Sequence, residues 1–218
     1  MIRHTASNPQ PAGAPSEPIV IVVDDDSAVR ASLDSLLRSV GMQTRLCASP
    51  AELLQAALPD VPGCIILDVR LPGISGLEFQ TQLSQHGIEL PIVFMTGFGD
   101  IPMTVQAMKA GAIDFLAKPF RDQDMLDAVT TAVERDRVRR SAAASMGNLR
   151  TEYETLTPRE REVMAHVVSG LMNKQVAGII GLSEITVKIH RGNVMRKMGV
   201  RTLADLVRKA QALGVSGG

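Results

Sequence analysis

The sequence has few of the features that mark a secreted, membrane-spanning or zinc-binding protein. It contains 2 cysteines and 4 histidines in 218 residues. Cys47 and Cys64 lie in apolar segments, as buried thiols of a reducing compartment do, and the histidines show no metal-ligand spacing. Apolar runs reach only about six residues, against the roughly 20 that span a bilayer. No apolar N-terminal signal is visible, so we expect a cytoplasmic protein with no membrane partner.

The net charge is zero, but the charge is unevenly distributed along the chain. Residues 19–122 carry 12 acidic and 7 basic side chains, a net of −5. Residues 158–218 carry 4 acidic and 10 basic side chains, a net of +6. This asymmetry predicts two domains with different partners, and the basic domain is the candidate for nucleic-acid binding.

Buried-strand patterns alternate with helical periodicity through the first half of the chain. Runs rich in β-branched and apolar residues predict five strands, at residues 19–23, 44–47, 64–68, 91–95 and 113–117. Amphipathic segments between and after them predict five helices, capped in three cases by Asp26, Ser49 and Asp100. Five strand–helix repeats predict an α/β domain with a doubly wound, five-stranded parallel sheet.

The remaining segments predict a tail, a linker and a small helical domain. Residues 1–17 are rich in Pro, Ala and Ser and predict a disordered tail. The α/β domain is expected over residues 18–137. Charged and then small residues over 138–154 predict a linker in which the last helix ends. Residues 155–218 predict a domain of four helices, at about 158–169, 173–180, 184–198 and 202–213, the first opened by a Thr157–Glu160 capping box.

Polar side chains follow four of the five predicted strands. They are Asp24 and Asp25 after the first strand, Asp68 as the last residue of the third, Thr96 after the fourth and Lys118 after the fifth. The carboxyl ends of parallel strands meet at one edge of a sheet, where sites form. Three crowded carboxylates repel one another unless a cation is present, and Mg²⁺ prefers oxygen ligands. With a lysine and a hydroxyl, they form a pocket suited to a phosphoryl group on a carboxylate nucleophile.

Residues 18–137 resemble the flavodoxin-like receiver domain of two-component response regulators. The resemblance rests on the acid pair, on Asp68-x-x-x-Pro72-Gly73, on Thr96-Gly97 and on Lys118-Pro119-Phe120. The run from Met108 to Phe120 is similar to that of the FixJ-type subgroup.

The resemblance implies a role for each of these residues. Asp68 is the expected phosphoacceptor, and Lys118, before a cis proline, pairs with the phosphoryl group. Mg²⁺ is expected on Asp24, Asp25, Asp68 and the backbone carbonyl of Arg70. Thr96 and Phe115 are the expected switch residues. Val105 and Lys109 are candidates for the dimer face, with core packing and a solvated lysine as the respective alternatives.

Two positions bear on the lifetime of the phosphoryl group. Arg70 stands two residues after Asp68, and Phe98 stands two residues after Thr96. Neither is an acid or amide that would orient water, so slow hydrolysis of the protein's own aspartyl phosphate is expected, without substrate turnover. An aspartyl-phosphate phosphohydrolase is the enzyme alternative, but such enzymes usually have an acid where Arg70 stands.

Residues 155–213 resemble the NarL/LuxR-type helix-turn-helix. The resemblance runs from Leu156-Thr157-Pro158-Arg159-Glu160 to Thr186-Val187-Lys188-x-His190. The packed face of the third helix is expected to carry Val187, His190, Val194 and Met198. Its other face includes Arg196. The expected phosphate contacts are Lys174, Thr186, Arg191 and Lys197, and the expected base contacts are Lys188, Ile189 and Gly192.

Together these features predict a DNA-binding transcriptional regulator that a histidine kinase switches by phosphorylating Asp68. Phosphorylation is expected to produce a homodimer that binds a two-fold site in duplex DNA. A regulator acting through protein or RNA contacts is the alternative in the binding class, and the basic face of the third C-terminal helix argues against it.

Overall fold

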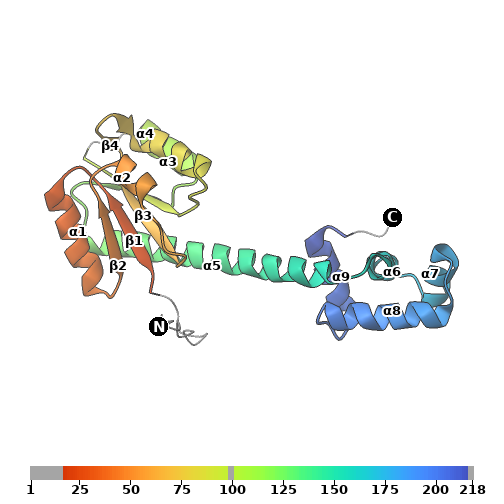
Figure 1. Cartoon of the computed structure of the whole chain (residues 1–218). Coiled ribbons are helices and arrows are strands. Elements are labelled where there is room, and N and C mark those ends of the chain that lie inside the picture. The colour runs from red at the N-terminus through yellow and green to blue at the C-terminus, as the bar shows by residue number, and fades with distance from the viewer. Residues whose placement is uncertain (1–16, 98–100, 216–218) are drawn as a thin grey trace, which may run out of the picture. The chain divides into compact units, whose positions relative to one another are not determined.

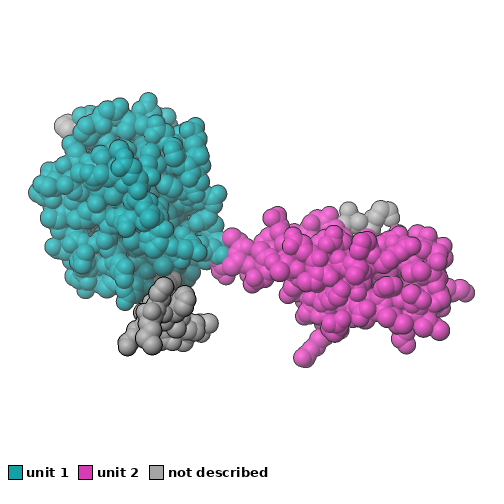
Figure 2. Space-filling model, in the orientation of Figure 1, with its two compact units in different colours: residues 1–140 teal, residues 141–218 magenta. Residues whose placement is uncertain are grey.

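The computed structural model describes residues 17–97 and 101–215. The chain divides into two compact units, Met1–Arg140 and Ser141–Gly218 (Figure 2). All of the predicted tail except Glu17, and the predicted cap Asp100, lie outside the described residues. Within the described ranges, no helix combines the length and apolar character needed to cross a bilayer.

The first unit is built on a five-stranded sheet in which every pairing is parallel (Figure 1). Across the sheet the strands are ordered β2 (Gln43–Cys47), β1 (Ile19–Val23), β3 (Gly63–Asp68), β6 (Ile92–Thr96) and β7 (Asp114–Ala117). The five predicted strands are thus confirmed, with ends shifted by one residue in four of them. The long apolar runs are strands because both faces of this sheet are covered.

Two apolar cores lie on opposite faces of the sheet. Alternate strand residues point to alternate faces, so Ile65 and Leu67 join one core and Cys64 and Ile66 the other. The first core is covered by α2 (Pro50–Gln55), α3 (Gly76–Gln85) and α4 (Ile101–Lys109). The second is covered by α1 (Ser27–Ser39) and the first part of α5 (Asp122–Glu154). The predicted doubly wound α/β class is confirmed.

The segment after β3 contains two further short strands. It forms a two-residue hairpin of β4 (Arg70–Leu71) and β5 (Ile74–Ser75). Between them, Pro72 is followed by Gly73 at φ 85°, the arrangement that a tight turn with a positive φ requires.

The helix predicted to end within the linker continues to Glu154, so the expected linker over 138–154 is helical. The prediction of an ending was wrong because the segment is rich in good helix formers and its single Gly147 costs only about 1 kcal/mol. Leu149 and Tyr153, near the end of α5, also pack on the core of the second unit.

The second unit packs four further helices around one apolar core. They are α6 (Pro158–Val168), α7 (Asn173–Ile180), α8 (Glu184–Lys197) and α9 (Leu203–Leu213), close to the predicted bounds. The predicted capping box is confirmed: the Thr157 hydroxyl accepts from the Glu160 N–H at 3.2 Å, and the Glu160 carboxylate accepts from the Thr157 N–H at 2.9 Å. Gly181, at φ 68°, ends α7 and begins the turn into α8.

Candidate functional site

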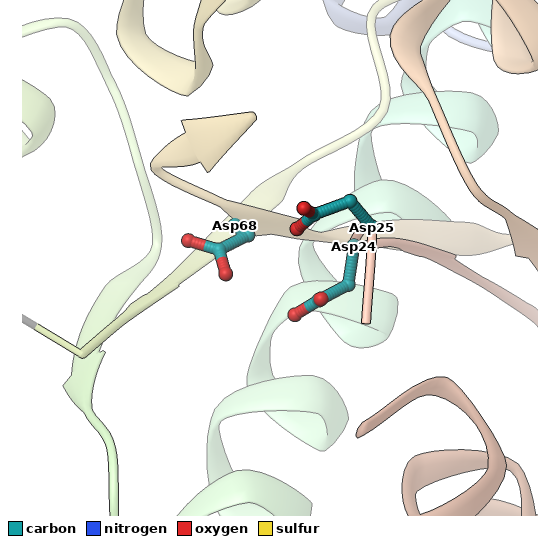
Figure 3. A group of neighbouring side chains, drawn as sticks. All are labelled: Asp24, Asp25 and Asp68. Carbon is teal, nitrogen blue, oxygen red and sulfur yellow. The ribbon is translucent and has the colours of Figure 1, made fainter. Parts of the chain in front are cut away.

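Three carboxylates meet at the carboxyl edge of the sheet. Oxygen atoms of Asp24, Asp25 and Asp68 lie within 4.8 Å of one another (Figure 3). Asp24 and Asp68 are buried and Asp25 is exposed. They form the one cluster of acidic, histidine or cysteine side chains in the described ranges with the spacing of a metal site.

The register of the sheet places these groups together. Val23, the last residue of β1, pairs with Leu67 of β3, so Asp24 and Asp68 follow at the same level. The backbone around Asp24 is tied down, since its carboxylate accepts from the Asp26 N–H at 2.8 Å and its carbonyl accepts from Arg30 at 2.6 Å. Asp26 caps α1, as predicted.

Lys118 supplies positive charge to this cluster. Its Nζ lies 2.6 Å from Oδ2 of Asp24 and 2.6 Å from Oδ2 of Asp68. Burial opposes the charge of this lysine, but the hydrogen bonds to Asp24 and Asp68 and the negative charges of these two groups together outweigh burial and raise the pKa of Lys118. The peptide bond from Lys118 to Pro119 is cis, as the family resemblance implied.

The cluster remains short of positive charge. One ammonium faces three carboxylates, and burial raises the pKa of Asp24 more than hydrogen bonds from Lys118 and from the Asp26 N–H lower it. Repulsion from Asp68 acts in the same direction as burial. A hard divalent cation with oxygen ligands fits this donor set and would remove the imbalance.

The expected switch residues lie on neighbouring strands. Thr96 is buried at the end of β6, and the Lys118 N–H donates to its carbonyl at 2.7 Å. Phe115 on β7 is half-buried, with its ring centroid 6.3 Å from that of Phe94. On α4, Val105 is 44% exposed and Lys109 is exposed, which excludes core packing for Val105.

Sequence reasoning missed two residues that support the pocket. Arg30 holds the Asp24 carbonyl, and nothing in its spacing distinguishes it from other surface arginines. At Gly76 a Cβ would lie 2.5 Å from the Asp68 carbonyl oxygen, so only glycine allows the start of α3 to approach the phosphoacceptor strand so closely. Its position at the start of a helix was the available signal. Phe98, which bears on the phosphoryl lifetime, lies outside the described residues.

In the second unit, α7 and α8 form a helix–turn–helix around Gly181. Val187, Val194 and Met198 are buried, as predicted for the packed face of α8. His190 is half-buried on the same face, and its Nδ1 has no hydrogen-bond partner among the described residues.

The residues predicted to contact DNA differ in their availability. The exposed ones are Lys174, Lys188, Ile189, Gly192 and Arg196, and the partly buried ones are Thr186, Arg191 and Lys197.

The partly buried cations among them have partners inside the unit. Arg191 donates to the Asn173 side chain at 3.2 Å. Lys197 forms an ion pair with Glu160 at 2.6 Å and donates to the Thr155 carbonyl at 3.0 Å. Burial favours the neutral form of Glu160, but the hydrogen bonds from Lys197 and Thr157 and the charge of Lys197 together outweigh it and hold the pKa of Glu160 below its usual range.

Comparisons with known proteins agree with both units. Residues 20–130 match the family model of the response regulator receiver domain, and residues 154–210 match that of bacterial regulatory proteins of the luxR family. Nodulation protein W of Bradyrhizobium diazoefficiens is 58% identical over 203 residues, which cover 93% of this chain and 89% of that protein. The transcriptional regulatory protein FixJ of Azorhizobium caulinodans is 43% identical, covering 90% and 93% respectively.

A solved structure gives the same result. The response regulator StyR superimposes with a TM-score of 0.83 at 46% identity, covering 90% of this chain and 99% of that one. The predicted fold and family are thus confirmed by sequence and by structure. The chain belongs to the response regulators of two-component systems, as a transcriptional regulator with a receiver domain and a LuxR-type DNA-binding domain.

Proposed function

We propose that Asp68 accepts a phosphoryl group from the phosphohistidine of a histidine kinase in the cytoplasm. A carboxylate oxygen of Asp68 attacks phosphorus, the P–N bond breaks, and an acyl phosphate forms on Asp68 as the kinase histidine leaves with the electron pair of that bond. The observation that carries the proposal is the position of the Asp68 carboxylate, 2.6 Å from the Lys118 ammonium and beside Asp24 and Asp25.

Mg²⁺ fits this pocket, with Asp24, Asp25, Asp68 and the backbone carbonyl of Arg70 as its proposed protein ligands. When bound, it would offset the carboxylate charge and attract the phosphoryl oxygens. Lys118 now binds the carboxylate that would be modified. Its ammonium can therefore pass to a phosphoryl oxygen with little movement, while its bond to Asp24 keeps it in place.

The phosphorylated state then changes the surface of the receiver domain. The Thr96 hydroxyl turns to the phosphoryl group, and the half-buried Phe115 moves inward behind it. The exposed face that includes Val105 and Lys109 on α4 then forms a homodimer, as a shift in population between two states.

The dimer presents two copies of α8 to a two-fold site in duplex DNA. Lys188, Ile189 and Gly192 face the bases, while Lys174, Thr186 and Arg191 hold phosphates. Arg196, exposed near the end of α8, adds positive charge to the DNA-binding face. A phosphate contact by Lys197 must compete with its ion pair to Glu160, so it is the weakest of these assignments.

Site selection from random duplex DNA tests the proposal, with and without a small acyl phosphate donor, on the wild type and Asp68→Asn. The expected result is a two-fold motif that the phosphorylated wild type enriches more strongly and that the variant enriches equally in both conditions. Enrichment of RNA but not of duplex DNA would favour the alternative binding class. A phosphoryl half-life of seconds would overturn the slow hydrolysis expected from Arg70.

A further inference from the structure

We propose that Ile185, together with Ile189, reads thymine methyl groups in the major groove. Ile185 has the most exposed side chain of any large hydrophobic residue in the described part of the chain, at 74%. Ile189 is 59% exposed. The inference rests on the proposed DNA binding by α8 and extends base contact to a residue outside the predicted set.

The two isoleucines lie on one side of α8. Residues four apart in a helix are neighbours on its surface, so Ile185 and Ile189 form one apolar strip. Gly192 continues the strip, since it is three residues beyond Ile189 and seven beyond Ile185. A Cβ at Gly192 would meet nothing within 4 Å, so this end of the strip is open and lets the helix backbone approach a ligand closely.

Cations border the strip. Lys188 is exposed between the two isoleucines in sequence, and Arg196 is exposed one turn beyond Gly192. An apolar strip edged by cations suits a ligand with apolar groups set among negative charges. Duplex DNA has this character in the major groove, where the thymine C5-methyl is the apolar group that base edges present.

Helix geometry sets the spacing of the thymines. Four residues of α-helix rise about 6 Å, which is close to two base-pair steps of about 3.4 Å each. The two isoleucines therefore contact thymines about two steps apart in each half-site. Removing one contacted methyl group is expected to lower the affinity about fourfold, which corresponds to the transfer free energy of one buried carbon.

The test compares thymine with deoxyuridine, which lacks only the methyl group. The full-length protein first selects a duplex, and deoxyuridine then replaces each thymine of one half-site in turn. The wild type is expected to lose about fourfold in affinity at each of two positions. Ile185→Ala is expected to bind the thymine and deoxyuridine duplexes equally at one of these positions and to keep the penalty at the other, with Ile189→Ala showing the converse.

Ile179→Ala is the matched control, because Ile179 on α7 is 58% exposed and lies outside the strip. It is expected to keep both penalties. Equal binding of thymine and deoxyuridine duplexes by the wild type would overturn the inference, as would an unchanged penalty in Ile185→Ala or a lost penalty in Ile179→Ala. Failure of the wild type to bind any duplex would overturn the proposed DNA binding and this inference with it.

Discussion

Lys118→Met tests the electrostatic account of the phosphorylation pocket. The substitution keeps much of the length of the side chain and removes the ammonium that lies 2.6 Å from both Asp24 and Asp68. Breaking a buried ion pair from one side costs about 3–5 kcal/mol. The Lys118 side chain is 22% exposed, so we expect the lower end of this range, about 3 kcal/mol.

Calorimetry of the full-length protein measures the effect as a change in the Tm of the receiver transition. For a unit of this size, a loss of about 3 kcal/mol lowers the Tm by about 12 °C. The raised pKa of Asp24 fixes the sign of the pH dependence. The raised pKa stabilises the folded state fully below pH 3.8, the ordinary pKa of an aspartate side chain, and this stabilisation disappears as the pH rises through the folded pKa. The loss of stability caused by Lys118→Met is therefore expected to be larger at neutral pH than in acid.

Magnesium provides the second part of this test. At about 100 times its Kd, a bound ion adds about 2.7 kcal/mol to the stability of the folded state. Mg²⁺ is therefore expected to restore most of the Tm lost in Lys118→Met, and to raise that of the wild type less because Lys118 competes for the same carboxylates. Lys174→Met, at an exposed lysine of the second unit, is the control. An unchanged receiver Tm in Lys118→Met, or no response to Mg²⁺, would refute the reasoning.

Three further predictions concern other parts of the chain. Glu160→Gln is expected to lower the stability of the second unit by about 1–3 kcal/mol at pH 7, and equal urea midpoints for the two proteins at this pH would contradict this. Because the pKa of Glu160 is lowered, the wild type has this extra stability above pH 4.5 and loses it as the pH falls through the folded pKa. The fully buried Asp136 carboxylate accepts hydrogen bonds from the Gly63 N–H, Arg139 and Arg140. Asp136→Asn is therefore expected to lower stability by about 3 kcal/mol and to speed hydrogen exchange of the Gly63 N–H, and an unchanged exchange rate would contradict this. Lys188→Ala is expected to weaken binding to the selected duplex by about 1–3 kcal/mol more than binding to random DNA. The affinity of the wild type is expected to fall steeply as salt rises, and an affinity that does not change with salt would count against α8 as the DNA-binding element.

Local patterns predicted the strands well, and with them the meeting of the strand-end side chains at one edge of the sheet. A strand covered on both faces is apolar along its whole length, so the apolar runs that end at Val23 and Asp68 are readily predicted as buried strands. The parallel register then brought the strand-end groups together without further information. The hairpin after Asp68 has strands of only two residues each, which is too short to show a periodic pattern in the sequence.

Contacts between distant segments decided the features that sequence reasoning missed. The end of α5 is helical partly because Leu149 and Tyr153 pack on the second unit. Lys197 looks like one more basic residue of a DNA-binding helix, but it pairs with Glu160, 37 positions earlier. Neither contact can be inferred from local sequence spacing, and each overrides what the local sequence alone predicts.

The central claim is that one carboxylate, Asp68, connects the receiver domain to DNA binding. The most direct measurement is the affinity for the selected duplex before and after treatment with an acyl phosphate donor and Mg²⁺, alongside the phosphoryl groups incorporated per chain. The wild type is expected to incorporate up to about one group and to bind the duplex at least about tenfold more tightly, which is about 1.4 kcal/mol of coupling. Asp68→Asn is expected to show neither change. An Asp68→Asn protein that incorporates phosphate and responds like the wild type would contradict the account.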